Sequence, residues 1–197
     1  MSNKITYISI DIECTGPIPG PFSMISLGAV AYTAHGKLLD SLTFNIKELP
    51  NSARDPNTMK FWSSYKAAWE LCQVNQLDPQ LAMNKFIAWL NKFENIVPIC
   101  YPAGFDFTFI YWYIVNYCGV NKNPLSFSCL DIKTYIAAIL NVPYYSVSKA
   151  MLPKEWLPER RHSHIALDDA LEQGYIFFKM LEYCNKLESG NLIAGKQ

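Results

Sequence analysis

The pattern of apolar and polar residues over the first part of the chain predicts three consecutive strands. Residues 4–11 (KITYISID) alternate between apolar and polar side chains and are rich in β-branched and aromatic types, as is typical of a strand with one buried face. We expect a second strand over residues 24–33 and a third over 38–46, with a tight turn at residues 35–37 (HGK) between them. Strands joined in this way form an antiparallel meander.

From residue 58 onward the apolar positions recur with the period of an α-helix, and helices alternate with short strands. Asp78 and Pro79 are a capping residue and a first-turn proline, and they predict a helix that runs to about Phe93. Residues 141–163 hold three prolines and predict a long irregular connection. The other expected elements are strands at 96–101 and 126–130 and helices at 106–118, 131–140 and 164–187.

This order of elements predicts an α/β fold. We expect a mixed five-stranded sheet, in which parallel strands extend the antiparallel meander, flanked by helices. No linker or repeat divides the chain, so we expect one domain over residues 1–197, with a core at about 4–188 and a frayed tail at 189–197. Ligands of such sheets bind outside the carboxyl ends of the strands, and the first place to look is just after Ile10.

Composition narrows the class of protein. Of the 197 residues 50% are hydrophobic and 17% are charged, which excludes a disordered or fibrous chain. Lys plus Arg and Asp plus Glu are 17 each, so a polyanion must be bound by local features rather than by overall charge. The cysteines are scattered without a Cys-x-x-Cys pair, and the N-terminus lacks the apolar segment of a signal peptide. No apolar run reaches the length of a membrane span, so we expect a cytoplasmic protein without a membrane partner.

Asp11 and Glu13 are the first candidates for chemistry, because they lie at the end of the first predicted strand. Two positions apart on an extended chain, their carboxylates point to the same face. Like charges in a crevice repel each other unless a cation neutralises them, and a site made of carboxylates favours Mg²⁺ or Mn²⁺ over zinc. The structural alternative is a pair of exposed acids at a strand end.

Further candidates follow the fourth strand and precede the last helix. Asp106 opens a predicted helix in the apolar stretch AGFDF, where an N-cap role is the ordinary alternative. His164 lies before the last helix, and Asp168 and Asp169 lie in its first turns. A loop histidine near acids suits a proton acceptor that works around neutral pH. The alternative is a solvent-facing histidine beside an acidic first turn, and spacing alone does not decide between Asp168 and Asp169.

Together these residues resemble the DEDDh (DnaQ-like) 3′–5′ exonuclease family, which has the RNase H-like fold and includes proofreading and oligoribonuclease-like enzymes. The motif DIECTG at residues 11–16 is the most specific part, and the resemblance covers roughly residues 4–185. It implies that the protein is a phosphodiester hydrolase that removes nucleotides from a 3′ end. It also implies that the protein binds two Mg²⁺ ions, for which Mn²⁺ can substitute, and that His164 is the general base. The implied metal ligands are Asp11, Glu13, Asp106 and Asp169.

The chemistry of these residue types is consistent with that assignment. Two divalent ions bring as much positive charge as the carboxylates bring negative charge, and they can clamp both the attacking and the leaving oxygen of a displacement at phosphorus. His164 would take the proton from the attacking water, a contribution of roughly 10²–10⁴ in rate.

Substrate contacts are expected around the same residues. Backbone N–H groups of the loop after Glu13 would meet the terminal nucleotide, with a glycine that permits close approach. Arg161 is placed to meet a phosphate, against the alternative of a solvated loop of mixed charge. Aromatic rings near the site would stack on bases. The loop residues are Cys14, Thr15 and Gly16, and the rings are Phe22, Tyr101 and Phe105.

Two stretches depart from the family pattern. Family members often carry His-Asn shortly before the Phe-Asp of the second motif, whereas residues 101–104 read YPAG here, which changes the contacts expected around Tyr101. The proline-rich loop at 17–22 is also unusual for the family, and we expect it to reshape the pocket for the last base.

The leading hypothesis is a metal-dependent 3′–5′ exonuclease that acts on the 3′ ends of short or single-stranded RNA or DNA. We lean toward RNA, because the composition shows no polymerase-docking extension. The alternative is a catalytically silent module of the same fold that binds a nucleic-acid end, although a pure binder gains nothing from repelling acids. An RNase H-type endonuclease is a third reading. Related exonucleases are often homodimers, and a homodimer is a further expectation.

Overall fold

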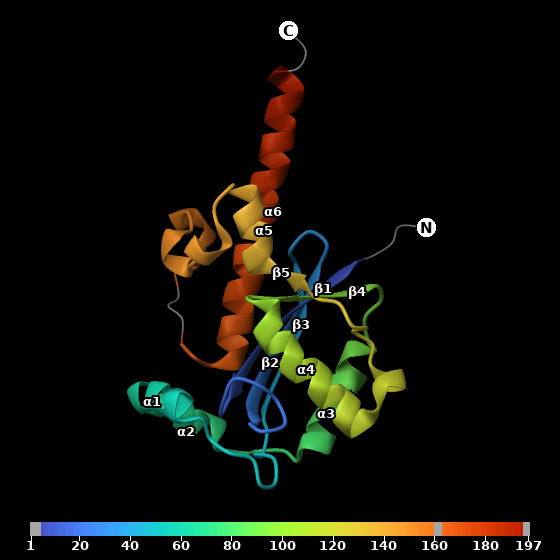
Figure 1. The fold of residues 1–197 in the computed structure, drawn as a ribbon. Helices are drawn as coiled ribbons and strands as arrows, with labels where there is room; N and C mark the ends of the chain where they lie inside the picture. The colour runs from blue at the N-terminus through green and yellow to red at the C-terminus, as the bar shows by residue number, and fades with distance from the viewer. Residues whose placement is uncertain (1–4, 160–162, 195–197) are drawn as a thin grey trace.

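The computed structural model describes residues 5–159 and 163–194, and a mixed five-stranded sheet forms its centre (Figure 1). The strand order is β3-β2-β1-β4-β5. β1 pairs with β2 and β2 with β3 in antiparallel fashion, whereas β1 pairs with β4 and β4 with β5 in parallel. The sheet predicted from the sequence is confirmed. The strands are β1 (Thr6–Cys14), β2 (Met24–Thr33), β3 (Leu38–Asn45), β4 (Ile96–Cys100) and β5 (Leu130–Asp131).

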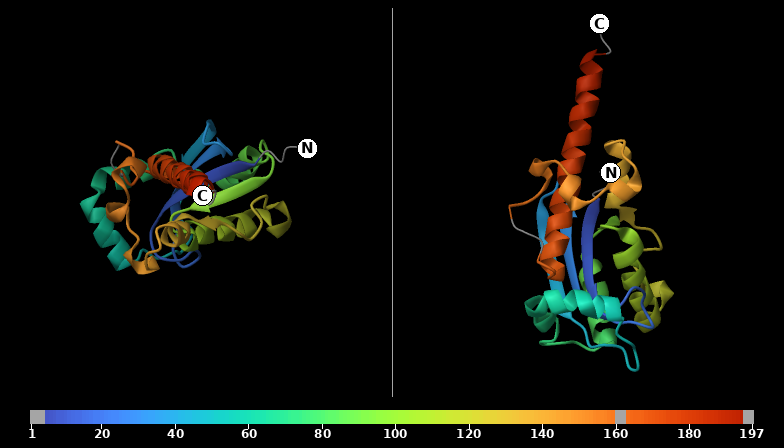
Figure 2. Two further views of the ribbon diagram at one scale, coloured as in Figure 1. Left: turned by 90° about the horizontal axis from the view of Figure 1, so that it is seen from above. Right: turned by 60° about the vertical axis from the view of Figure 1, so that its left-hand side comes forward.

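Helices cover both faces of this sheet (Figure 2). α6 packs on β1 and β2, and α3 and α4 pack on each other at the opposite face. The helices are α1 (Pro56–Ser64), α2 (Lys66–Cys72), α3 (Pro79–Leu90), α4 (Ala103–Cys118), α5 (Ile132–Ile139) and α6 (Ala166–Ala194). Short 3₁₀ turns follow α4 and α5 and are η1 (Val120–Lys122), η2 (Tyr144–Ser146), η3 (Lys149–Met151) and η4 (Lys154–Trp156).

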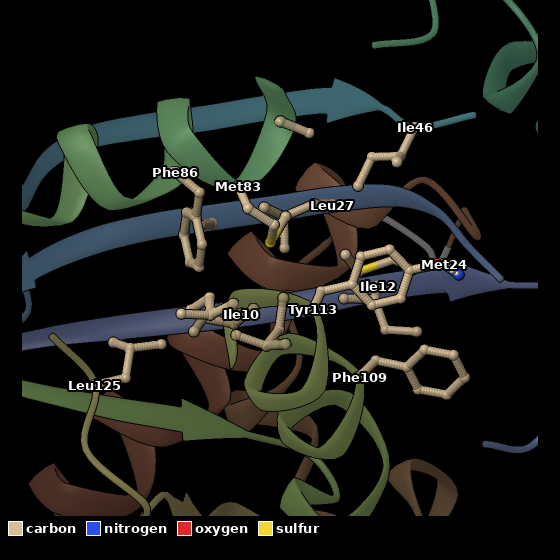
Figure 3. Packing of buried hydrophobic residues seen from close by; sticks show 14 of the residues in the cluster. Ile10, Ile12, Met24, Leu27, Ile46, Met83, Phe86, Phe109, Tyr113 and Leu125 are labelled. Atoms are coloured by element: carbon tan, nitrogen blue, oxygen red, sulfur yellow. Dashed lines mark hydrogen bonds between the residues drawn. The ribbon is translucent and has the colours of Figure 1, made fainter. Parts of the chain in front are cut away.

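The alternation of side chains along β1 separates the core from the site. Ile10 and Ile12 are buried against Phe86 of α3 and against Phe109 and Tyr113 of α4 (Figure 3). Because neighbouring residues of a strand point to opposite faces, Asp11 between these isoleucines and Glu13 after them turn toward α6. The burial of the apolar set therefore fixes which face of β1 carries the acids.

Several expected element boundaries shift in the structure. β2 and the start of α3 lie where the sequence predicts them, and Asp78 caps α3 by accepting a hydrogen bond from the Gln80 N–H. The strand expected at 126–130 is reduced to Leu130 and Asp131, and the last helix begins at Ala166 rather than 164 and runs to Ala194 rather than 187. Among the described residues, the helices are too short or too polar to cross a membrane.

Two glycines allow close approaches that position the last helix. Gly28 on β2 pairs with Asp11 on β1, and a Cβ at Gly28 would lie 2.2 Å from the backbone of Ala166. The N-terminus of α6 can therefore lie directly against the sheet beside Asp11. Gly174 makes room in the same way for the ring of Tyr32, since its Cβ would lie 2.7 Å from that ring.

Candidate active site

β1 delivers two of the predicted residues to the carboxyl end of the sheet. Asp11 is half-buried and Glu13 is buried, and the register of β1 with β2 shifts between Glu13 and Cys14. Such a β-bulge ends regular pairing and re-aims side chains. The expectation that the two acids share one region is confirmed, and the alternative of two exposed acids is wrong for both.

Asp106 comes from the first turn of α4 and is 3% exposed. Its Oδ1 accepts a hydrogen bond of 3.1 Å from the Ile12 N–H, which ties the helix to β1 between the two strand acids. The N-cap alternative is wrong, because α4 begins at Ala103. The Ala103 N–H donates a hydrogen bond of 2.6 Å to Oδ2 of Asp131, so an acid at the end of β5 stabilises the start of the helix.

His164 and Asp169 flank the start of α6. His164 has a φ of 54°, in the left-handed region, and so lies outside the helix as the sequence predicts. Asp169 is 3% exposed and lines the same cavity as His164, whereas Asp168 accepts a hydrogen bond of 3.1 Å from the Ser163 hydroxyl. Sequence spacing alone does not decide between Asp168 and Asp169 as the metal ligand, and the structure brings Asp169 to the cavity.

All five residues meet at one cavity of about 290 Å³. Side-chain ligand atoms of Glu13, His164 and Asp169 lie within 4.8 Å of one another, close enough to share a cation. The cavity joins elements that are distant in sequence, namely β1, α4 and α6. Its lining residues are Asp11, Ile12, Glu13, Tyr101, Pro102, Phe105, Asp106, Lys149, His164, Asp169 and Gln173.

The electrostatics of this cavity favour a divalent cation. Burial raises the pKa of Asp11 well above its ordinary value, and the charges of Asp106, Glu13 and Asp169 raise it further. Burial likewise raises the pKa of Asp106 to about 7, against the opposing effect of the Ile12 N–H. Carboxylates that are costly to ionise beside each other form an oxygen donor set that suits a hard divalent ion. The residues present therefore fit the metal ions that the DEDDh pattern implies.

The predicted substrate contacts divide into two groups. Tyr101 and Phe105 line the cavity as expected, and Cys14 and Gly16 line a second cavity of about 420 Å³ beside it. Ile12, Glu13 and Phe105 line both cavities, so the two cavities are adjacent and share one wall. Arg161, expected to meet a phosphate, lies outside the described residues.

Two of these expectations are wrong. Thr15 is fully buried, and its N–H donates a hydrogen bond of 2.9 Å to the Ser23 carbonyl rather than facing a ligand. Phe22 lines neither cavity, because its ring packs on Gly16, where a Cβ would lie 2.2 Å away. Gly16 is thus required for the packing of its own loop, a contact that no pattern in the sequence predicts.

Three features of the site escaped sequence reasoning. Lys149, in the irregular connection, lines the cavity and forms an ion pair with Glu172. The side-chain Nε2 of Gln173 donates a hydrogen bond of 2.6 Å to the Ile10 carbonyl, and its buried Oε1 has no hydrogen-bond partner among the described residues. Its position one turn after Asp169 is a signal that the helical period could have supplied.

The third feature is a pair of rings around His164. The ring centroids of Phe61 and Tyr65 lie 4.8 and 4.1 Å from that of His164, and 4.8 Å from each other. Phe61 lies in α1, and Tyr65 directly follows that helix. The two rings, called the ring clamp below, hold the imidazole of the candidate base between them. The sequence shows these rings only as part of a helical pattern.

A mixed sheet with four carboxylates and a loop histidine at its carboxyl end is the arrangement of a metal-dependent nuclease with the RNase H-like fold. Over 182 residues the chain is 30% identical to "3′-5′ DNA exonuclease Cap18" of Escherichia coli, which covers 89% of this chain and 91% of that protein. The chain therefore belongs to the DEDDh family of 3′–5′ exonucleases.

Other similarities agree with this assignment. The chain is 25% identical over 183 residues to a PolC-type DNA polymerase III of Thermotoga petrophila, of which it spans 12%. Its fold matches the nuclease domain of 3′hExo, described as a DEDDh family member bound to rAMP, with a TM-score of 0.67 and 18% identity, over 91% of this chain and 92% of that one. It also matches a product-bound exonuclease I with a TM-score of 0.63 and 12% identity, over 91% of this chain and 43% of that one. No protein-family model matches the chain.

Proposed function

We propose that this 3′–5′ exonuclease acts on single-stranded DNA and uses two Mg²⁺ ions, for which Mn²⁺ can substitute. The observation that carries the proposal is the meeting of Asp11, Glu13, Asp106, Asp169 and His164 at one cavity. DNA is chosen over the RNA favoured from composition, because the relative that aligns over most of both chains is named a DNA exonuclease.

The four carboxylates would hold the ions, which would supply positive charge that stabilises the displacement at phosphorus. His164, held outside α6, takes a proton from the attacking water. The water oxygen forms a bond to phosphorus, and the bond from phosphorus to the 3′ oxygen of the preceding nucleotide breaks. The terminal nucleotide leaves with a 5′-phosphate, and the 3′ oxygen of the shortened strand takes up a proton from solvent to become a hydroxyl.

The second cavity supports binding of a terminal nucleoside. It abuts Glu13 and carries the rings of Phe61 and Phe105, whose faces can stack on a base. The polar side chains of Asn57 and Thr58 also line it and can accept or donate hydrogen bonds. A base in this cavity would place its phosphate toward the acidic cluster.

A degradation ladder on 5′-labelled DNA and RNA oligomers of matched sequence tests the proposal. We expect stepwise shortening from the 3′ end with Mg²⁺ or Mn²⁺, none with a chelator, and faster removal from DNA. Asp11→Asn should lower turnover by at least about 10³-fold, the scale of losing a preorganised electrostatic group. Equal rates on both polymers, or faster removal of nucleotides from RNA, would contradict the proposed preference for DNA. Wild-type turnover in the variant would remove Asp11 from the site.

A further inference from the structure

Lys149 reaches the acidic cavity. Of the described residues that line the cavity, Lys149 is the one Lys or Arg, and it lies in η3 of the irregular connection. Its ammonium is paired with Glu172 of α6, and the two side chains are 30% and 10% exposed.

Stability alone is a weak reason for such a pair. Withdrawing two ions from water costs about as much as their attraction returns, and apolar replacements often do as well. Glu172 lies on the same side of α6 as Asp169 and next to Gln173, both of which line the cavity. The pair therefore holds a cation at the wall of the site rather than in the apolar core.

The reaction requires positive charge at this wall. The phosphodiester is an anion, negative charge builds on its oxygens during attack, and the chain has no net charge to attract it. Metal ions held by the carboxylates would offset their charge and supply positive charge to the displacement. An ammonium is a compact cation with three donors and can meet a remaining oxygen.

We propose that Lys149 donates to a non-bridging oxygen of the terminal phosphodiester, and that Glu172 positions the lysine for this contact. The proposal rests on the exonuclease activity and adds a substrate-binding residue to it. The competing explanation is that Lys149 merely offsets the carboxylates. The two explanations differ in their consequences, because removing a cation beside metal ligands strengthens metal binding, whereas removing a phosphate contact weakens substrate binding.

The test uses Lys149→Met and Lys149→Arg in the full chain, with Lys154→Met as the matched control, since Lys154 is exposed on the same connection and lines no cavity described above. Fluorescence anisotropy with a labelled single-stranded DNA, in Ca²⁺ to prevent cleavage, gives substrate affinity. Turnover is measured over a range of Mg²⁺ concentrations that reaches saturation. A charge-assisted hydrogen bond predicts a loss of about 10- to 100-fold in affinity or kcat for Lys149→Met. Lys149→Arg should recover part of it, and Lys154→Met should match the wild type.

Wild-type affinity and kcat in Lys149→Met at saturating Mg²⁺ would overturn the proposal, as would a defect that higher Mg²⁺ removes. If Lys149→Met does not fold, a wild-type affinity and kcat in Glu172→Gln would overturn it instead, because an unpositioned lysine should bind the phosphate less well. Cleavage by the wild-type chain and its loss in Asp11→Asn report separately on the proposed function. The Lys149 inference can therefore fail while the exonuclease assignment holds.

Discussion

Asp168 and Asp169 are adjacent in sequence but differ in burial and in their access to the cavity. Asp169 is buried at the cavity, with ligand atoms near those of Glu13 and His164, whereas Asp168 is half-buried and lines neither cavity. We expect Asp169→Asn to lower turnover by about 10³-fold and Asp168→Asn to lower it by less than about 10-fold. The two variants are each other's control, because they make the same chemical change one position apart. A larger loss in Asp168→Asn would reassign the ligand.

The raised pKa of Asp106 makes the metal-free protein sensitive to pH. The carboxyl ionises near 3.8 when unfolded, and burial raises its pKa to about 7 in the folded chain. Between these values the folded state keeps a proton that the unfolded state releases, so stability is fully present below the lower pKa and is lost as pH rises through the upper one. With a chelator present, we expect the melting temperature to fall from about pH 4 to about pH 7.

The raised pKa of Asp11 acts in the same direction, so Asp106→Asn should flatten this profile without abolishing it. Thermal melts followed by circular dichroism across that pH range give the measurement. A melting temperature that rises with pH in the chelated wild type would mean that other groups dominate.

Among the elements, those that local signals define are the ones that the sequence predicts well. β2 and the turn at Gly36, which has a φ of 79°, depend on alternation and on a glycine, and α3 depends on Asp78 and Pro79. The start of α4 depends instead on Asp131, whose carboxylate meets the Ala103 N–H across 28 positions. No pattern within a helix reports a contact of that kind.

The candidate site follows the same division. The acids and His164 could be recognised from their order along the chain, because each follows or precedes a regular element. Lys149 could not, since it lies in an irregular connection with no period and reaches the cavity only after that connection folds over α6. Phe22 was misassigned because proximity in sequence to Gly16 does not show whether a ring faces the cavity or the glycine.

α1 contributes to the site through the ring clamp on His164. Tyr65 contacts the histidine ring but lines neither cavity, whereas Phe61 contacts it and also lines the second cavity. We therefore expect Tyr65→Ala to lower kcat by about 10- to 100-fold with little change in KM, because misplacing a reacting group slows the reaction without weakening substrate binding. Phe61→Ala should affect both constants.

Tyr65→Phe keeps the ring and should retain wild-type kcat, and Tyr145→Ala removes a tyrosine that is 87% exposed and serves as the control. Steady-state kinetics on one labelled DNA strand measures all four variants. An equal loss in Tyr65→Phe and Tyr65→Ala would show that the hydroxyl, not the ring, matters.

For the whole molecule, charge is arranged locally rather than overall. Lys plus Arg equals Asp plus Glu, yet acids from β1, α4 and α6 gather at one end of the sheet. The apolar packing of α3 and α4 on one face and of α6 on the other holds these elements together despite the repulsion. The metal-free chain therefore carries an electrostatic cost at its site that a bound cation relieves.

Divalent metal should accordingly stabilise the entire fold. A ligand that binds only the folded state adds RT ln(1 + [L]/Kd), about 2.7 kcal/mol at a hundred times Kd. We expect Mg²⁺ or Mn²⁺ at millimolar concentration to raise the melting temperature of the wild type, relative to NaCl of matched ionic strength. Glu13→Gln should lose most of this rise, since Glu13 shares the cluster with His164 and Asp169. Because the variant also removes a repelling charge, its metal-free melting temperature should equal or exceed that of the wild type, and a lower value would show that repulsion does not dominate at this position.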